Sequence, residues 1–144
     1  MWNTAETENG VFMAYIIDGL RSYIGIENSM YRHISAEQLG AGVLDRLAER
    51  TGIDKVDCII AGNAVGAGGN IARVMSLSTV FGVETPAFTV DMQCGSSLES
   101  IALAAAKIDA GQADIVIAGG FESSSTAPKL SLIHISEPTR RSYI

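Results

Sequence analysis

The sequence of 144 residues is short of cysteine and of concentrated positive charge. Its two cysteines, Cys58 and Cys94, fall in separate predicted elements and lack the spacing of zinc ligands. Acidic residues outnumber basic ones, the net charge is −6, and no segment gathers Lys and Arg. We therefore expect no metal site, and neither nucleic acid nor an anionic membrane as a partner.

Long apolar runs are also missing. No stretch approaches the roughly 20 residues that a membrane-spanning helix needs. The opening MWNTAETENG is acidic and has no apolar core of the signal-peptide kind. With 47% hydrophobic and 18% charged residues, the composition is that of a globular domain able to bury a core. A reducing cytoplasm is the expected location.

The pattern that is present alternates short apolar strands with helices. Strands are predicted at residues 14–18, 56–61, 87–92 and 114–120, and helices from Ser35 to Gly52, through residues 73–81, and over residues 95–110. Ser35 and Gln38 have the spacing of a capping box, and Gly52 stands where a C-cap glycine belongs. Strands joined by helices predict an α/β fold with a mostly parallel sheet built from right-handed βαβ crossovers.

The helix predicted over residues 95–110 is apolar around nearly its whole circumference. Helices of this kind are buried on all sides. A simple three-layer domain would leave one face of the helix in water, so the pattern predicts a further layer or a partner over it. Nothing else in the sequence is obviously free to supply that cover.

The two cysteines lie in different contexts. Cys58 falls inside an apolar strand, where free cysteine is usually structural. Cys94 falls just past the carboxyl end of a strand and at the start of a helix, which is where ligands bind in open α/β sheets. Backbone N–H groups at a helix start favour a thiolate and could stabilise an oxyanion. Position alone leaves Cys94 open as a nucleophile or a structural residue.

Other signals are weaker. The stretch GNAVGAGGNIAR has Ile71 where a dinucleotide fingerprint needs its third glycine, so a tight loop is favoured over a nucleotide site. Glu122, at a strand end, is either catalytic or bonded to nearby backbone. His33 is expected to be solvated. Gly is missing two residues before and after Cys94, which argues against a hydrolase nucleophile elbow.

Taken together, several stretches resemble the N-terminal part of the thiolase family. DMQCGSSL resembles the family's cysteine motif, and AGGFESSSTAP resembles the motif that follows the next helix. YIIDGLRSYIG, LGAGVLDRLAERTGI and IIAGNAVGAGGNIAR resemble its opening strand, first helix and Gly-rich loop. The resemblance covers about residues 14–128 in register, and it implies part of the N-terminal half of a layered αβαβα fold, with Cys94 at the position of the acyl-accepting cysteine.

The resemblance implies an acyl-CoA C-acyltransferase that forms or thiolytically cleaves 3-ketoacyl-CoA through an acyl group on Cys94. Its substrates would be coenzyme A thioesters, with no bound cofactor, and the full-length enzyme would be a homodimer or homotetramer. The alternatives are another condensing enzyme of the superfamily, of the ketoacyl or hydroxymethylglutaryl synthase type, or a non-catalytic protein that binds CoA or serves as a scaffold.

The sequence departs from the family pattern at Asp91, Ser97 and Ser124, which leaves the acyl-chain preference open. The motifs that supply the family's activating His and second Cys do not occur here, so the fragment is expected to be inactive. Residues 1–13 are interpreted as a leader outside the core and residues 14–130 as a partial thiolase domain. Residues 131–144 resemble translated adapter sequence and are interpreted as a foreign tail.

Overall fold

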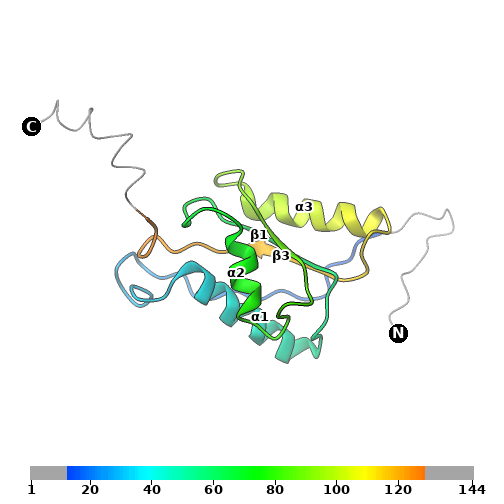
Figure 1. Cartoon of the computed structure of the whole chain (residues 1–144), viewed down its shortest axis with the longest axis horizontal. Helices are drawn as coiled ribbons and strands as arrows, with labels where there is room; N and C mark the ends of the chain where they lie inside the picture. The colour runs from blue at the N-terminus through cyan, green and yellow to red at the C-terminus, as the bar shows by residue number, and fades with distance from the viewer. Residues whose placement is uncertain (1–12, 129–144) are drawn as a thin grey trace, which may run out of the picture.

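A computed structural model describes residues 13–128 of the chain. Within this range a parallel sheet is formed by β1 (Cys58–Gly62), β2 (Ala87–Val90) and β3 (Val116–Gly120), in the order β2-β1-β3. The helices are α1 (Ala36–Thr51), α2 (Ile71–Leu77) and α3 (Ser96–Asp109). Figure 1 shows the sheet between α3 on one side and α1 on the other. The predicted α/β class and parallel sheet are confirmed.

The central strand, β1, is buried along its whole length because helices cover both faces of the sheet. Ile59 and Ala61 point to the side of α1 and α2, where they join a core that also contains Leu44, Met75 and Phe81. Cys58 and Ile60 point to α3, where they pack with Ala104. A strand buried on both faces needs apolar residues at every position, which explains its lack of alternation.

Helix α1 begins and ends as predicted. The Ser35 side chain accepts a hydrogen bond from the Gln38 amide, and the Gln38 side chain accepts one from the Ser35 amide, which completes the capping box. Gly52 ends the helix with φ 71°, a left-handed conformation that glycine adopts without steric cost. Local chemistry therefore determines both ends of α1.

Helix α2 is shorter than predicted. It ends at Leu77, and Phe81 lies in the turn that follows, where it is buried. The Arg73 guanidinium donates to the carbonyl oxygens of Val83 (3.0 Å) and Thr85 (2.5 Å), so the chain after α2 folds back onto the helix.

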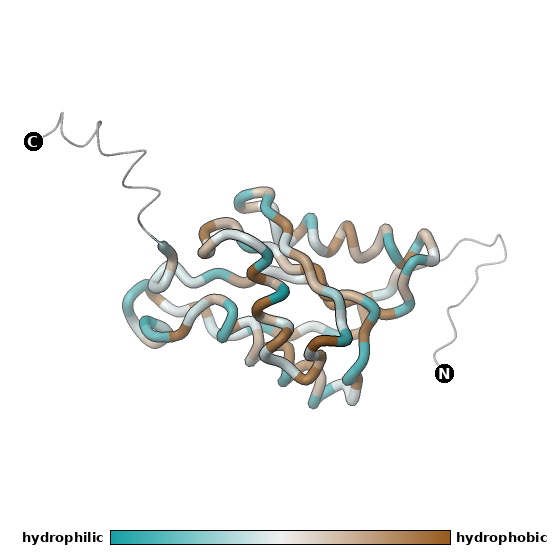
Figure 2. The backbone as a smooth tube through the Cα atoms, in the orientation of Figure 1, coloured by the Kyte–Doolittle hydropathy of each residue, from teal (hydrophilic) through white to brown (hydrophobic). Residues whose placement is uncertain are grey.

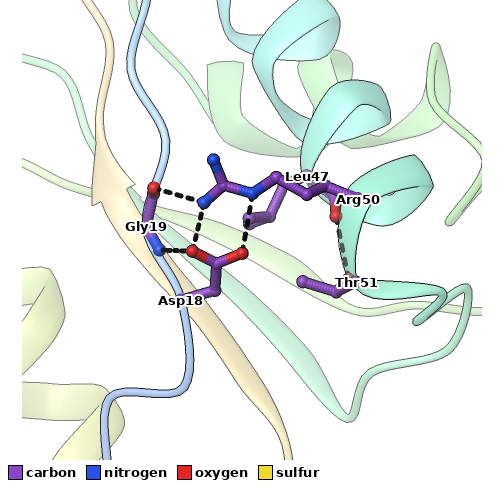
Figure 3. A network of polar contacts seen from close by, with 5 residues as sticks. All are labelled: Asp18, Gly19, Leu47, Arg50 and Thr51. Atoms are coloured by element: carbon purple, nitrogen blue, oxygen red, sulfur yellow. Dashed lines mark hydrogen bonds and ion pairs between the residues drawn. The ribbon is translucent and has the colours of Figure 1, made fainter.

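The strand predicted at residues 14–18 is not formed, and residues 13–26 have no regular secondary structure. Strands are stabilised by hydrogen bonds to neighbouring strands, and this segment pairs with neither of the two outer strands of the sheet, β2 and β3. The segment is held instead by the Arg50 guanidinium, which is paired with Asp18 and donates to the Gly19 carbonyl oxygen at 2.8 Å (Figure 3). Ile16 and Ile17 remain exposed.

Helix α3 is the feature that differs most from the expectation of burial on all sides. Its buried residues are small: Ser96, Ser100 and Ala104. Leu98 is 71% exposed and Ile101 41%, and hydrophobic residues recur along the helix in Figure 2. Within residues 13–128 nothing covers this outer face, and the predicted further layer or partner remains a prediction. The expected foreign tail, 131–144, and the expected leader apart from Met13 lie outside the described residues.

Candidate active site

Cys94 is exposed and lies in the turn that joins β2 to α3. The turn is closed by Ser96, whose hydroxyl donates to the Gln93 carbonyl oxygen at 2.6 Å and accepts from the Met92 amide at 2.8 Å. Gln93 has φ 51°, an uncommon conformation for a residue with a side chain. Asp91 adds a further constraint, because its carboxylate accepts a hydrogen bond from the Gln93 amide at 3.0 Å. Cys94 is thus presented to solvent by a tightly bonded turn.

The structure modifies the sequence prediction in one respect. Helix α3 begins at Ser96 with Gly95 as its N-cap, so Cys94 precedes the helix instead of lying in its first turn. The amides of Gly95 and Ser96 donate to the carbonyl oxygens of Met92 and Gln93, both at 3.1 Å. These two N–H groups at the helix start therefore bond within the turn.

The start of α3 lies directly on the carboxyl ends of two strands. A Cβ added to Gly62, the last residue of β1, would lie 2.5 Å from the carbonyl carbon of Ser96. A Cβ added to Gly120, the last residue of β3, would lie 2.7 Å from Cβ of Ser97. The buried Ser100 hydroxyl lies 2.7 Å from the carbonyl oxygen of Gly119 and links the next turn of the helix to β3. Cys94 therefore lies at the carboxyl end of the sheet, where ligands bind in open α/β folds.

Cys58 is buried, whereas Cys94 is exposed. Cys58 is 9% exposed, on the side of the sheet that α3 covers. Burial raises the pKa of the Cys58 thiol; the positive charge of Lys107 opposes this rise and the negative charge of Asp57 adds to it. A thiol with a raised pKa is a poor nucleophile, because the thiolate is the reactive form. The geometry supports the structural role expected for Cys58.

Glu122 bonds backbone groups, which is one of the two roles that the sequence left open. Its Oε2 atom accepts from the amides of Ala64 and Val65, both at 3.0 Å. Its Oε1 atom accepts from Nδ2 of Asn63 at 3.1 Å. The carboxylate therefore ties the residues after β3 to the loop that follows β1.

The Gly-rich stretch after β1 forms the tight loop that was expected. Gly68 and Gly69 have φ angles of 83° and 70°, which favour glycine. The loop leads to Asn70, which caps α2 through a hydrogen bond from the Arg73 amide. His33 is exposed, and its Nε2 atom accepts a hydrogen bond from Arg32 at 2.9 Å. In the part of the chain that the structure describes, no three His, Cys, Asp or Glu side chains gather as a metal site.

Sequence reasoning overlooked Ser96, Ser100 and Asn63, each buried and each bonded at this end of the sheet. A signal for two of them was available. Ser96, Ser100 and Ala104 recur at intervals of four, so they form one stripe of small residues along a helix face. Such a stripe permits close approach to the sheet. Asn63 carries no comparable signal, because its role depends on groups about 27 and 58 residues away in the sequence.

The fold and the site together define a layered α/β protein that presents an exposed cysteine between a strand end and a closely packed helix. A family model described as "Thiolase, N-terminal domain" matches residues 14–142. The chain belongs to the thiolase family, and within it to the N-terminal domain.

Individual relatives agree with this assignment. The chain is 41% identical over 115 residues to YhfS of Bacillus subtilis, named as a candidate acetyl-CoA C-acetyltransferase, and 40% identical over 129 residues to the steroid 3-ketoacyl-CoA thiolase FadA6 of Mycobacterium tuberculosis. The alignments cover 80% and 86% of this chain but only 31% and 32% of the relatives. The chain thus spans about a third of the length of these proteins.

A solved structure, the acetyl-CoA acetyltransferase of Bacillus anthracis, shares the fold. It superposes with a TM-score of 0.68 at 29% identity, over 72% of this chain and 27% of that protein. The similarity supports the thiolase-like α/β architecture expected from the sequence. No helix among residues 13–128 has the length and hydrophobicity needed to cross a bilayer.

Proposed function

We propose that the chain is part of an acyl-CoA C-acyltransferase of the thiolase type, in which Cys94 accepts the acyl group. The single observation that supports this role most directly is the exposure of Cys94 on a rigid turn at the carboxyl end of the sheet. The family membership supplies the chemistry: relatives are named as acetyl-CoA acetyltransferases and a 3-ketoacyl-CoA thiolase.

In the proposed reaction the Cys94 thiolate attacks the carbonyl carbon of an acyl-CoA. A bond forms between that carbon and the cysteine sulfur, the bond to the CoA sulfur breaks, and CoA leaves as a thiolate that takes up a proton. A second acyl-CoA, deprotonated at its α-carbon, then attacks the acyl group and releases Cys94 as a 3-ketoacyl-CoA forms. The covalent intermediate divides one difficult step into two easier steps. Reversal of these steps is thiolytic cleavage.

The proton transfers in this scheme need groups beyond Cys94. Within residues 13–128 the sole histidine is His33, which is exposed and bonded to Arg32. We therefore propose that the remaining groups belong to the rest of a longer enzyme and that the 144-residue chain alone has no turnover. The uncovered outer face of α3 supports the same conclusion, because a large apolar face in water indicates a missing neighbour.

We further propose that the whole enzyme acts on acyl-CoA thioesters without a bound cofactor, as a homodimer or homotetramer in the cytoplasm. Family membership supports the substrate class. The exposed apolar residues Leu98 and Ile101 are consistent with burial by further parts of an assembly.

The decisive experiment is acyl transfer from acetyl-CoA to the complete protein, read by peptide mass spectrometry. We expect a thioester on the Cys94 peptide, its loss in Cys94→Ala, and its retention in the matched control Cys58→Ala. Binding of CoA without acylation would refute the enzyme proposal and support a scaffold role. Acylation that persists in Cys94→Ala would show that another residue is the nucleophile.

A further inference from the structure

We propose that Glu122 is a positioning residue for the Cys94 site: together with Asn63 it fixes the carboxyl ends of the three strands on which the Cys94 turn rests. The inference builds on the proposed function of Cys94. Glu122 itself is not expected to contact the reacting atoms.

Asn63 is the point at which the three strand ends meet. It follows β1 directly and is 7% exposed. Its backbone amide donates to the carbonyl oxygen of Val90, the last residue of β2, at 3.1 Å. Its Nδ2 group donates to the carbonyl oxygen of Phe121, just after β3, at 2.8 Å and to Glu122 at 3.1 Å. Asn63 thus joins the end of β1 to β2 through its backbone amide and to the residues after β3 through its side chain, and Glu122 accepts a hydrogen bond from that side chain.

The contacts of Glu122 require a carboxylate. All of its partners are donors: the Asn63 side chain on one oxygen and the amides of Ala64 and Val65 on the other. A carboxamide at this position would direct its NH₂ group at a donor in either orientation, which leaves a hydrogen bond unmade. Glutamine is therefore a disruptive replacement here, although its size is nearly the same.

The network reaches both sides of Cys94. On the amino side, Asn63 bonds Val90, after which the Cys94 turn begins. On the carboxyl side, Gly62 is in close contact with the backbone of Ser96, the first residue of α3. A shift of residues 62–63 therefore moves the two ends of the turn that presents Cys94. Misplacement of a reacting group by about 1 Å can lower a rate by about a hundredfold.

Asp57 provides a matched control at the opposite end of the same strands. Its Oδ2 atom accepts from the amides of Asp114 (2.7 Å) and Ile115 (2.9 Å), so it also ties β1 to β3 through two backbone N–H groups. Loss of either carboxylate should weaken the sheet to a similar extent. The loss of Glu122 alone should disturb Cys94.

The first test is amide hydrogen exchange on the 144-residue chain. Glu122→Ala is expected to accelerate exchange at Ala64 and Val65 about tenfold or more, since a charged hydrogen bond is lost. Asp57→Ala should accelerate exchange at Asp114 and Ile115 and leave residues 64–65 unchanged. Unchanged exchange at residues 64–65 in Glu122→Ala would overturn the proposal, and this result does not depend on whether Cys94 is ever acylated.

The second test is acetylation of Cys94 by acetyl-CoA in the complete protein. We expect the rate to fall about tenfold or more in Glu122→Ala and in Glu122→Gln, and less than threefold in Asp57→Ala. Cys58 should remain unreactive to iodoacetamide in both Glu122 variants, which shows that their fold is retained. Equal losses in the Glu122 and Asp57 variants would indicate a merely structural role and refute the inference. A wild-type protein that takes up no acetyl group would refute the proposed function instead, and amide exchange would then decide the role of Glu122.

Discussion

Helices α1 and α3 lie on opposite sides of the sheet and bury different kinds of side chain. Helix α1 buries Leu44 among its apolar residues and directs charged side chains outward, including the Arg46–Glu49 pair at 2.8 Å. Helix α3 turns a stripe of small residues toward the sheet and leaves Leu98 and Ile101 exposed. The arrangement of α1, with an apolar face inward and charged residues outward, is that of an ordinary surface helix.

The difference shows how each helix contributes to the protein. A small-residue stripe brings α3 so close to the sheet that Gly62 and Gly120 are needed beneath it, and this contact places the Cys94 turn. The large apolar residues Leu98 and Ile101 of α3 remain exposed. Helix α1 contributes Leu44 to the core, whereas α3 packs closely on the sheet beside the Cys94 turn and leaves Leu98 and Ile101 exposed.

The largest difference in stability is expected when one leucine of each helix is replaced by alanine. Leu44→Ala should lower the free energy of unfolding by about 2–5 kcal/mol, because it removes buried methyl groups and leaves a cavity. Leu98→Ala should change it by less than about 0.5 kcal/mol, because Leu98 is 71% exposed. Urea denaturation followed by circular dichroism measures both values.

A loss above about 1 kcal/mol in Leu98→Ala would contradict this contrast and show that Leu98 is covered in solution. Sedimentation of the double variant Leu98→Lys, Ile101→Lys then tests whether self-association of the chain covers Leu98. We expect it to associate less than the wild-type chain, because it removes the exposed apolar face.

The second contrast concerns glycine. Gly62→Ala should destabilise the protein by about 1–3 kcal/mol, because its Cβ would collide with the backbone of Ser96. Gly42→Ala, in α1, should stabilise it by about 0.5–1 kcal/mol, since an added Cβ meets nothing within 4 Å and alanine favours helix. Thermal unfolding of the two variants shows whether each substitution raises or lowers the stability. A neutral or stabilising Gly62→Ala would mean that α3 lies farther from the sheet.

The third contrast concerns the helix starts. Ser35→Ala removes the side-chain cap of α1 and should cost about 1 kcal/mol. Helix α3 has no side-chain cap, so Ser97→Ala at the second position of α3 should change stability by less than about 0.5 kcal/mol. Chemical denaturation distinguishes the two, and equal losses would contradict the assignment of the cap.

The smallest effect on stability is expected for the contacts that hold residues 13–26 against α1 and α3. Asp109 of α3 accepts a hydrogen bond from the Ala14 amide at 2.8 Å, and Arg50 of α1 pairs with Asp18. The hydrogen bond from Arg50 holds the pKa of Asp18 below its ordinary value of 3.8. A lowered folded-state pKa means that the pair contributes stability above the ordinary pKa and loses it as the pH falls through the folded-state pKa.

Asp18→Asn should therefore be slightly less stable than the wild-type chain near neutral pH, and the difference should vanish in strong acid. Urea midpoints of the two proteins across this range provide the measurement. A difference that grows on acidification would show that the ion pair is not its source.

Much of the fold was predictable because it depends on local chemistry. The capping box at Ser35, the glycine at Gly52 and the uniform apolar character of β1 each follow from residues near one another in the sequence. The strand at residues 14–18 was predicted wrongly: the apolar run pairs with neither outer strand of the sheet, and hydrogen bonds from Arg50 hold the segment instead.

The site was predictable in part. Cys94 was proposed as the nucleophile from its position after a strand and from the family resemblance, whereas the contacts around it could not be predicted. Asn63 and Glu122 meet across 59 positions of sequence, and Gly62 at the end of β1 meets Ser96 at the start of α3, with α2 and β2 between them in the sequence. These contacts depend on strand order and helix placement, which no local pattern contains.

The sequence by itself determined the alternation of strands and helices, the caps of α1 and the resemblance to thiolases. Each of these depends on residues that lie close together in the sequence. Only the tertiary structure decided which face of α3 touches the sheet and which groups Glu122 bonds. Those outcomes depend on backbone atoms that come together only when distant strands pair and the helices pack against them.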